Sequence, residues 1–201
     1  MKIIVLGLSS QALKKFGAIQ TDGVEYVSLD NTNIKDFGKN SLIFIVGDAA
    51  ELSLTKENKN LILFVPLNDY SNDIRAYAVL HDKDLVSIPA LADLLLKPGF
   101  INLNLDDLKE FFRNVKDVYV LSETAEGVEL AFRNLIASNS VIQSASKILL
   151  GVTTNSETSL SEISEGIQIL LGAAKEDVEI LWGHIINEDF DDKVKITLFI
   201  A

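Results

Sequence analysis

The most informative stretch of this chain runs from Lys147 to Ile186 and reads KILLGVTTNSETSLSEISEGIQILLGAAKEDVEILWGHII. Its first seven residues are mostly apolar and β-branched, and the segment 178–186 alternates in polarity, so both are predicted to be strands. Between them, Ser159 and Glu162 fit a capping box, in which two side chains bond the free N–H groups of a helix start. Apolar residues then recur along one helix face up to about Ala174. The pattern predicts strand, helix and strand.

The flanking sequence extends this pattern into an α+β domain. Helical spacing is present on both sides of a short β-branched run, and the last residues again alternate like a half-buried strand. The predicted elements are a helix over 105–114 capped by Asn104, a strand over 117–121, a helix opening near Thr124, and strands over 178–186 and 193–200 joined as a hairpin by the loop 187–192.

The first half of the chain has a different rhythm. Four short apolar runs alternate with polar or helical pieces, which is typical of parallel strands in an open, doubly wound α/β sheet. Segment 69–83 is ambiguous, and a helix over 84–97 is predicted to stop at Pro98-Gly99. The predicted strands cover 2–6, 25–29, 41–46 and 61–65, with short helices over 10–16 and 49–57.

Composition excludes several classes of function. The chain has 29 acidic and 18 basic residues, a formal charge of −11, so neither nucleic acid nor an anionic membrane is expected as a partner. It has no cysteine and two histidines, which leaves no basis for a disulfide, a thiolate nucleophile or a cysteine-bound metal. No apolar run reaches the length of a membrane helix, so a cytoplasmic protein without metal or cofactor is predicted.

Sequence motifs in the second half of the chain resemble those of the FtsZ family of the tubulin superfamily. The match begins at 92–108, ADLLLKPGFINLNLDDL, continues through Leu149-Leu150-Gly151-Val152-Thr153, and closes with VEILWGHIINED at 178–189. The resemblance implies an α/β fold with a shortened Rossmann-like parallel-sheet domain of tubulin/FtsZ type, a central helix and a C-terminal α+β domain. The implied boundaries are 1–84 for the reduced nucleotide-binding-type domain, 85–104 for the central helix and synergy-like loop, and 105–201 for the FtsZ C-terminal-like domain.

The first half lacks the glycine-rich wording with which the family binds GTP. After the first strand the chain reads Gly7-Leu8-Ser9-Ser10, and the family's glycine- and threonine-rich signature is replaced by 47–52, GDAAEL. Backbone N–H groups of such glycines surround phosphates, whereas carboxylates at Asp48 or Glu51 repel them. The sequence therefore predicts that no nucleotide is bound.

In the family, the synergy loop enters the nucleotide pocket of the next subunit and supplies two acidic side chains. Carried over to this chain, the loop's asparagine is Asn102, its first aspartate falls on Asn104 and its second on Asp107. An amide at 104 cannot accept a proton, so half of the carboxylate pair is missing and no catalytic residue is predicted. Asn104 and Asp107 serve in the simplest interpretation as a helix cap. The candidate interface loop consists of Pro98, Gly99, Phe100, Asn102, Asn104 and Asp107.

Other polar or aromatic residues have structural interpretations. His81 is expected in a solvated loop, His184 at the edge of a core with a hydrogen-bonded ring, and Trp182 in a core. The acidic loop 188–192 matches no calcium-ligand spacing, and Ser9 and Ser10 have no candidate base.

These features favour a non-catalytic FtsZ-like protein, a pseudo-GTPase that acts by protein–protein interaction in the cytoskeleton of cell division. Its expected partner is an FtsZ-type filament subunit, which it caps or regulates, or a second copy of itself. Since the sequence ends after the last predicted strand, no flexible tail and no membrane tether are expected. The alternatives are a structural protein that self-assembles without nucleotide and, with less support, a residual GTPase.

Overall fold

The computed structural model describes residues 1–7, 12, 14, 21–28, 40–47, 60–68, 76–82 and 84–201. They divide into two compact units, of which unit 1 comprises Met1–Ala92 and Asn104–Val118, and unit 2 comprises Asp93–Leu103 and Tyr119–Ala201. The chain crosses from one unit to the other inside helix α2 (Ser87–Leu96), before helix α3 (Leu105–Phe111), and inside strand β6 (Asp117–Glu126).

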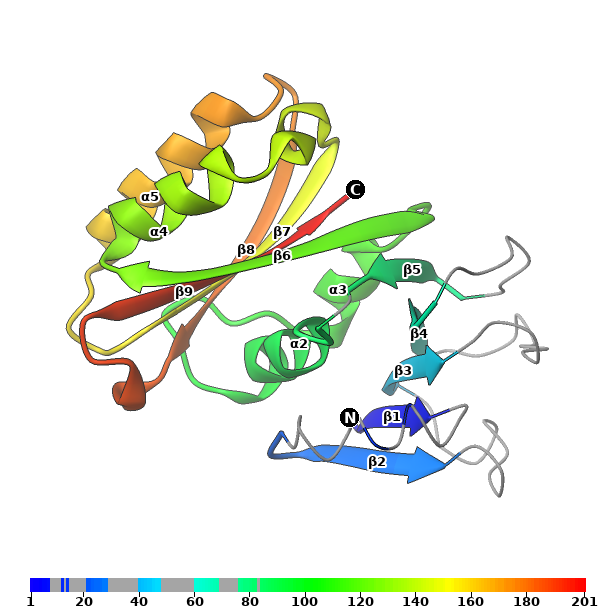
Figure 1. Ribbon diagram of the computed structural model, residues 1–201. Helices are drawn as coiled ribbons and strands as arrows, with labels where there is room; N and C mark the ends of the chain where they lie inside the picture. The colour runs from blue at the N-terminus through cyan, green and yellow to red at the C-terminus, as the bar shows by residue number, and fades with distance from the viewer. Residues whose placement is uncertain are drawn as a thin grey trace. The chain divides into compact units, whose positions relative to one another are not determined.

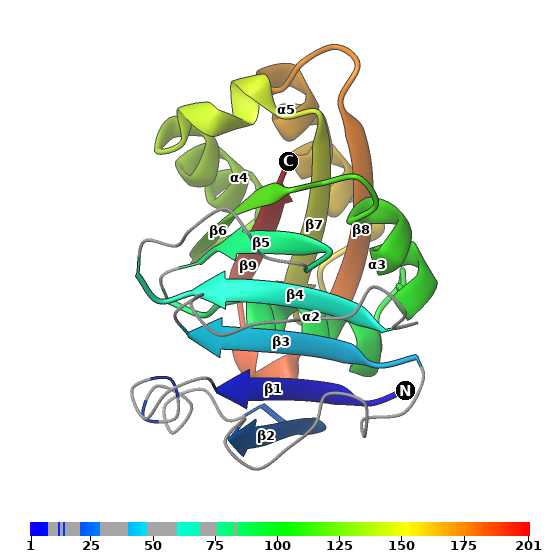
Figure 2. The same cartoon turned by 90° about the vertical axis from the view of Figure 1, so that its right-hand side faces the viewer.

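Unit 1 is built on a parallel sheet with the strand order β2-β1-β3-β4-β5, visible as a ladder in Figure 2. Its three central strands are buried along nearly their whole length, which is why they read as continuous apolar runs. The predicted parallel α/β sheet is therefore confirmed, while the predicted helices at 10–16 and 49–57 lie largely or wholly outside the described residues. The strands are β1 (Ile3–Gly7), β2 (Val24–Ser28), β3 (Leu42–Gly47), β4 (Leu61–Pro66) and β5 (Ala78–His81).

Helix α3 belongs to unit 1, although the sequence interpretation placed residues 105–201 together in the second domain. The helix contacts strand β4, and its residues Leu105 and Leu108 are buried together with the following Phe112. Burial of this apolar face assigns the helix to the first sheet.

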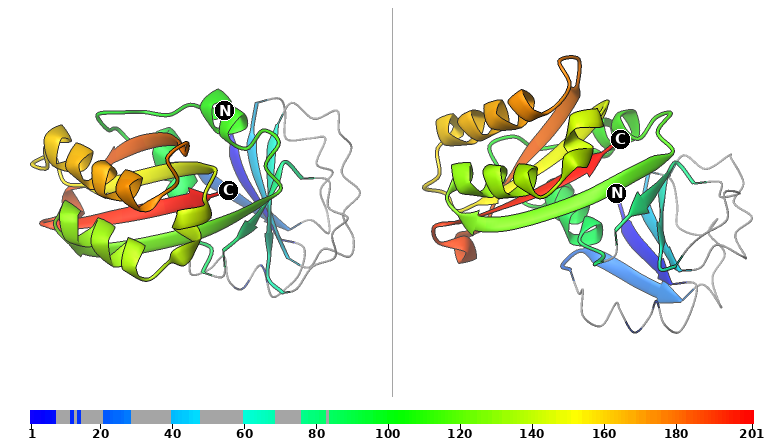
Figure 3. Two further views of the ribbon diagram at one scale, coloured as in Figure 1. Left: turned by 90° about the horizontal axis from the view of Figure 1, so that it is seen from above. Right: turned by 45° about the horizontal axis from the view of Figure 1, so that its top comes forward.

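Unit 2 is a four-stranded mixed sheet with the order β6-β9-β7-β8, covered on one face by helices α4 and α5 (Figures 1 and 3). Side chains of both helices and of strands β7 and β9 form a common apolar core. Strand β9 is antiparallel to both β6 and β7, and β8 is parallel to β7. The elements are α4 (Val128–Ala137), η4 (Ser140–Ser144), β7 (Lys147–Thr154), α5 (Leu160–Ala173), β8 (Glu179–Ile186), η5 (Glu188–Phe190) and β9 (Lys193–Ile200).

Two sequence predictions for unit 2 were wrong. Strands β8 and β9 do not form a hairpin, because β7 lies between them. The segment near Thr124 is not the start of a helix, because β6 continues to Glu126 and pairs along its length with β9. Helix α4 begins only after Gly127, whose backbone angle φ of 78° separates it from the strand.

Candidate functional site

The first half of the candidate loop lies along the outer edge of strand β8. The backbone N–H of His184 donates to the carbonyl of Ile101 (2.8 Å), and that of Ile186 donates to Pro98 (2.9 Å). A Cβ at Gly99 would lie 1.7 Å from the carbonyl oxygen of His184, so only glycine allows the two backbones to approach this closely. Segment 98–101 is therefore held to the sheet by its main chain.

A pair of facing glycines seats the residues that flank this segment. Gly151 of β7 and Gly183 of β8 are register partners. A Cβ at Gly183 would lie 2.7 Å from the side chain of Leu94 and 3.0 Å from that of Leu103, and one at Gly151 would lie 3.3 Å from Leu94. The absence of side chains at both positions lets the residues before and after the loop pack directly on the sheet.

The imidazole of His184 anchors the loop through a hydrogen bond to its backbone. The ring is buried, with 1% exposure, and its Nδ1 accepts a hydrogen bond from the backbone N–H of Phe100 (3.2 Å). Its Nε2 lies 2.9 Å from Thr154 Oγ1, whose own hydrogen is donated to the carbonyl of Asn155 (2.8 Å). These directions require the neutral tautomer with its proton on Nε2. Burial lowers the pKa of His184 below its ordinary value of 6.5.

The expectation of a buried, hydrogen-bonded His184 is therefore confirmed, but its contact with the loop was not foreseen. Its two partners lie 84 and 30 residues away in the sequence, so no local pattern reports them. The ring of Phe100 also stacks on the imidazole, with centroids 4.9 Å apart and planes 8° from parallel.

Side chains on the outward side of the loop are exposed. Phe100 is 47% exposed, and Pro98 and Asn102 are exposed as well. Leu96, at the end of α2, has the same exposed fraction of 47% and was not singled out from the sequence. Asn102 uses its Nδ2 to bond the carbonyl of Gly99 (3.2 Å), which closes the loop on itself. This segment therefore presents apolar and amide groups to solvent.

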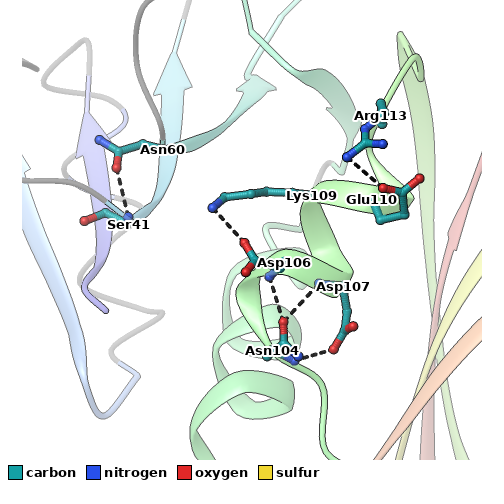
Figure 4. A network of polar contacts seen from close by, with 8 residues as sticks. All are labelled: Ser41, Asn60, Asn104, Asp106, Asp107, Lys109, Glu110 and Arg113. Atoms are coloured by element: carbon teal, nitrogen blue, oxygen red, sulfur yellow. Dashed lines mark hydrogen bonds and ion pairs between the residues drawn. The ribbon is translucent and has the colours of Figure 1, made fainter.

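The second half of the loop is a helix cap in unit 1 (Figure 4). Asn104 Oδ1 accepts from the backbone N–H groups of Asp106 (2.8 Å) and Asp107 (3.1 Å). Asp107 Oδ2 accepts in return from the backbone N–H of Asn104 (2.8 Å), which completes a capping box at the start of α3. The capping interpretation of these two residues is therefore confirmed.

This arrangement limits the chemistry that the loop can perform. Asn104 cannot act as a base, and the carboxylate of Asp107 is bonded to the backbone. The neighbouring Asp106 is 88% exposed at its side chain and pairs with Lys109 (3.0 Å). The described loop thus holds one carboxylate at the two positions where the resemblance implies two.

The carboxyl edge of the unit 1 sheet is the other place where a ligand is expected. Strands β1 and β3 are neighbours that end at Gly7 and Gly47, and the strand order reverses direction between them. In open α/β sheets, ligands bind at such a switch point. The segments that follow, with Ser9, Ser10, Asp48 and Glu51, lie outside the described residues.

The structure also shows the surroundings of three other candidates from the sequence: His81, Trp182 and the acidic segment 188–192. His81 ends strand β5, and its Nε2 lies 2.9 Å from Asp117 Oδ1, so the expected solvated loop is wrong. Trp182 packs partly buried against the unit 2 core. Among the described residues no group of three metal-ligating side chains is found, in the acidic segment 188–192 or elsewhere.

Comparison with known proteins places this geometry in a family context. Residues 121–201 match the model of the FtsZ family, C-terminal domain. A structure of a mutant FtsZ from M. jannaschii superimposes with a TM-score of 0.71 at 13% identity, covering 100% of this chain and 90% of that one. An empty FtsZ dimer from M. jannaschii gives a TM-score of 0.72 at 14% identity, covering 99% and 87%.

A third structure, GDP-form protofilaments of TubZ from Bacillus thuringiensis serovar israelensis, gives a TM-score of 0.61 at 10% identity and covers 100% of this chain and 85% of that one. The chain therefore has the tubulin/FtsZ fold. More particularly, the match to the FtsZ family, C-terminal domain, covers residues 121–201, which contain helices α4 and α5 and strands β7, β8 and β9. Among the described helices, none has both the length and the apolar character needed to cross a lipid bilayer.

Proposed function

We propose that this FtsZ-like protein is a pseudo-GTPase that acts by binding another protein through the loop Pro98–Asp107. Its partner is an FtsZ-type subunit, and the outcome is capping or regulation of a filament. Such a partner implies a cytoplasmic location. The protein supplies a loop that docks on the next subunit and lacks the paired carboxylates with which family members activate water.

The use of Asn104 and Asp107 as a reciprocal helix cap carries this proposal. The two positions that the resemblance links to catalysis bond each other's backbone, while Pro98, Phe100 and Asn102 remain exposed on a main chain anchored to β8. An anchored loop with an exposed aromatic side chain suits protein recognition, because little conformational entropy is lost when it docks.

A filament assay with a matched pair of variants tests the proposal. Substoichiometric protein is added to polymerising FtsZ from the same cell, and growth is followed by light scattering. We expect slower growth or a lower plateau with the natural protein, and an effect at least about tenfold weaker with Phe100→Asp. Leu171→Asp is the control, since this leucine on α5 is also exposed (37%) and lies outside the loop. Equal effects of the two variants would refute a docking role for the loop.

Calorimetry with GTP and GDP, with and without magnesium, tests the non-catalytic part. No heat of binding is expected at millimolar nucleotide, because the glycine-rich wording is absent from the sequence. Micromolar affinity would refute the pseudo-GTPase assignment, revive the residual GTPase and direct attention to Asp107.

Self-association without nucleotide is the second candidate. Two of the fold relatives are described as a dimer and as protofilaments, and their identity to this chain is 14% and 10%. Sedimentation of the protein alone distinguishes the candidates. A sedimentation coefficient that rises with concentration, and with salt that screens the −11 charge, favours self-assembly. A constant monomer value favours a different partner.

A further inference from the structure

The position of the exposed Phe100 depends on one buried side chain. Segment 98–101 has two backbone hydrogen bonds to β8, and both use the N–H groups of strand residues. The bond from the N–H of Phe100 to His184 Nδ1 is the point where a side chain of the strand grips the loop. The parallel stacking of the two rings sets the direction in which the aromatic side chain leaves the loop.

This grip works in one protonation state. When the imidazole binds a second proton, Nδ1 becomes a donor and faces the N–H of Phe100, which is also a donor. Thr154 cannot compensate, because it lies at Nε2 and gives its own hydrogen to Asn155. Protonation therefore replaces one hydrogen bond by a repulsive contact at the loop.

Within the part of the chain that the structure describes, the ring has no charged hydrogen-bond partner. No carboxylate among the described residues is hydrogen-bonded to His184, and burial disfavours the charged imidazolium. Charged side chains on the adjacent elements are engaged elsewhere or exposed. Asp93 of α2 pairs with Lys97, just beyond the helix (3.1 Å), and Lys147 pairs with Glu179 at the far ends of β7 and β8 (3.4 Å). Glu188 accepts from the N–H of Ser156 (3.4 Å), and Glu157 and Asp189 are exposed.

We propose that His184 is the positioning residue of segment 98–101, and that protonation of its ring releases the segment from β8. The meaning of this inference for binding rests on the proposed function, because the released segment is the one that presents Phe100. A drop in pH then weakens docking while the fold of unit 2 persists.

Amide hydrogen exchange of the free protein, read by NMR, tests the inference. Protection factors, corrected for intrinsic exchange, are compared at pH 7.5 and 5.5 for the amides of Phe100, His184 and Ile186. If His184 has an ordinary pKa near 6.5 when the segment is released, and binds no proton when the segment is seated, the protection factors should fall by up to about tenfold between pH 7.5 and pH 5.5. The amide of Ile163, bonded to Ser159 in α5, serves as the internal control and should keep its protection.

His184→Asn is the matched variant. Its amide oxygen takes the place of Nδ1 in the side chain, so it can accept from Phe100 but cannot bind a proton at these pH values. We expect protection at Phe100 that does not change with pH. If this variant does not fold, ¹⁵N shifts of the imidazole in the natural protein decide, with Nδ1 unprotonated and Nε2 protonated at pH 7.5.

The opposite tautomer, or an unchanged protection of Phe100 between the two pH values, would overturn the inference. Failure of the proposed function has a separate signature. If the natural protein has no effect on FtsZ filaments but the protection of Phe100 still falls at low pH, the proposed function alone is refuted. If the protein affects FtsZ filaments but the protection of Phe100 does not change with pH, the positioning role of His184 alone is refuted.

Discussion

Replacing Gly99 by alanine tests whether the loop is truly seated on β8. The new Cβ would lie 1.7 Å from the carbonyl oxygen of His184 and 2.6 Å from its carbonyl carbon, and backbone atoms cannot swing aside as a side-chain tip can. Segment 98–101 must then lift from the strand. It loses two backbone hydrogen bonds and the bond from Phe100 to His184. At about 0.5–1.5 kcal/mol net for each of these three bonds, the expected cost is about 1.5–4.5 kcal/mol.

Urea unfolding followed by tryptophan fluorescence measures this cost. Trp182 is the one tryptophan of the chain and lies on β8, two residues before His184, so it reports on unit 2. Gly172→Ala is the matched control, because nothing lies within 4 Å of a Cβ there and alanine favours the α5 helix by up to about 1 kcal/mol. If Gly99→Ala unfolds within about 0.5 kcal/mol of the natural protein, a value typical of neutral surface changes, the seating of the loop is wrong.

Three further predictions concern helix packing and caps. Gly166→Ala places a Cβ 2.4 Å from the ring of Phe132, and we expect overpacking to cost about 1–3 kcal/mol in urea unfolding; an unchanged midpoint would contradict the close approach of α4 and α5. Ser159→Ala should cost about 1 kcal/mol at pH 7. The hydroxyl and backbone N–H of Ser159 bond the Glu162 carboxylate and lower its pKa from 4.5. The part of the cap that depends on this carboxylate is present above pH 4.5 and is lost as pH falls through the lowered value, so Ser159→Ala should cost less at pH 3 than at pH 7, and equal costs would contradict it. Asn104→Asp should leave thermal stability unchanged while Asn104→Ala loses about 1 kcal/mol, because aspartate caps as well as asparagine; equal losses in both would exclude the capping role.

Much of the fold was predictable because its strands are buried on both sides or alternate cleanly. The misses lie where a distant partner determines the local conformation. Strand β5 is four residues long, too short to give a period, and forms because β4 offers it an edge. The extension of β6 through Thr124 depends on β9, which lies some 70 residues further along the chain. Pairing with β9 overrides the helical spacing of the apolar residues near Thr124.

The candidate loop was found through its wording, and the capping role of Asn104 followed from the residue type and its place before an apolar period. Two features were out of reach. The grip of His184 on Phe100 joins residues 84 positions apart, and the need for Gly99 arises from the carbonyl of the same histidine residue. A lone histidine among apolar strand residues carries no signal of which backbone it contacts.

The place of strand β9 in the sheet determines the order in which the two units can fold during synthesis. It lies between β6 and β7, and the backbone of Ala201 bonds Ser146 and Lys147. While residues 193–200 are still inside the ribosome, β6 and β7 have no common neighbour, and the sheet that supports α4 and α5 cannot close. The parallel strands β1–β5 emerge long before. Unit 1 is therefore free to fold during translation, whereas unit 2 completes its sheet only after nearly all of the 201 residues have left the exit tunnel.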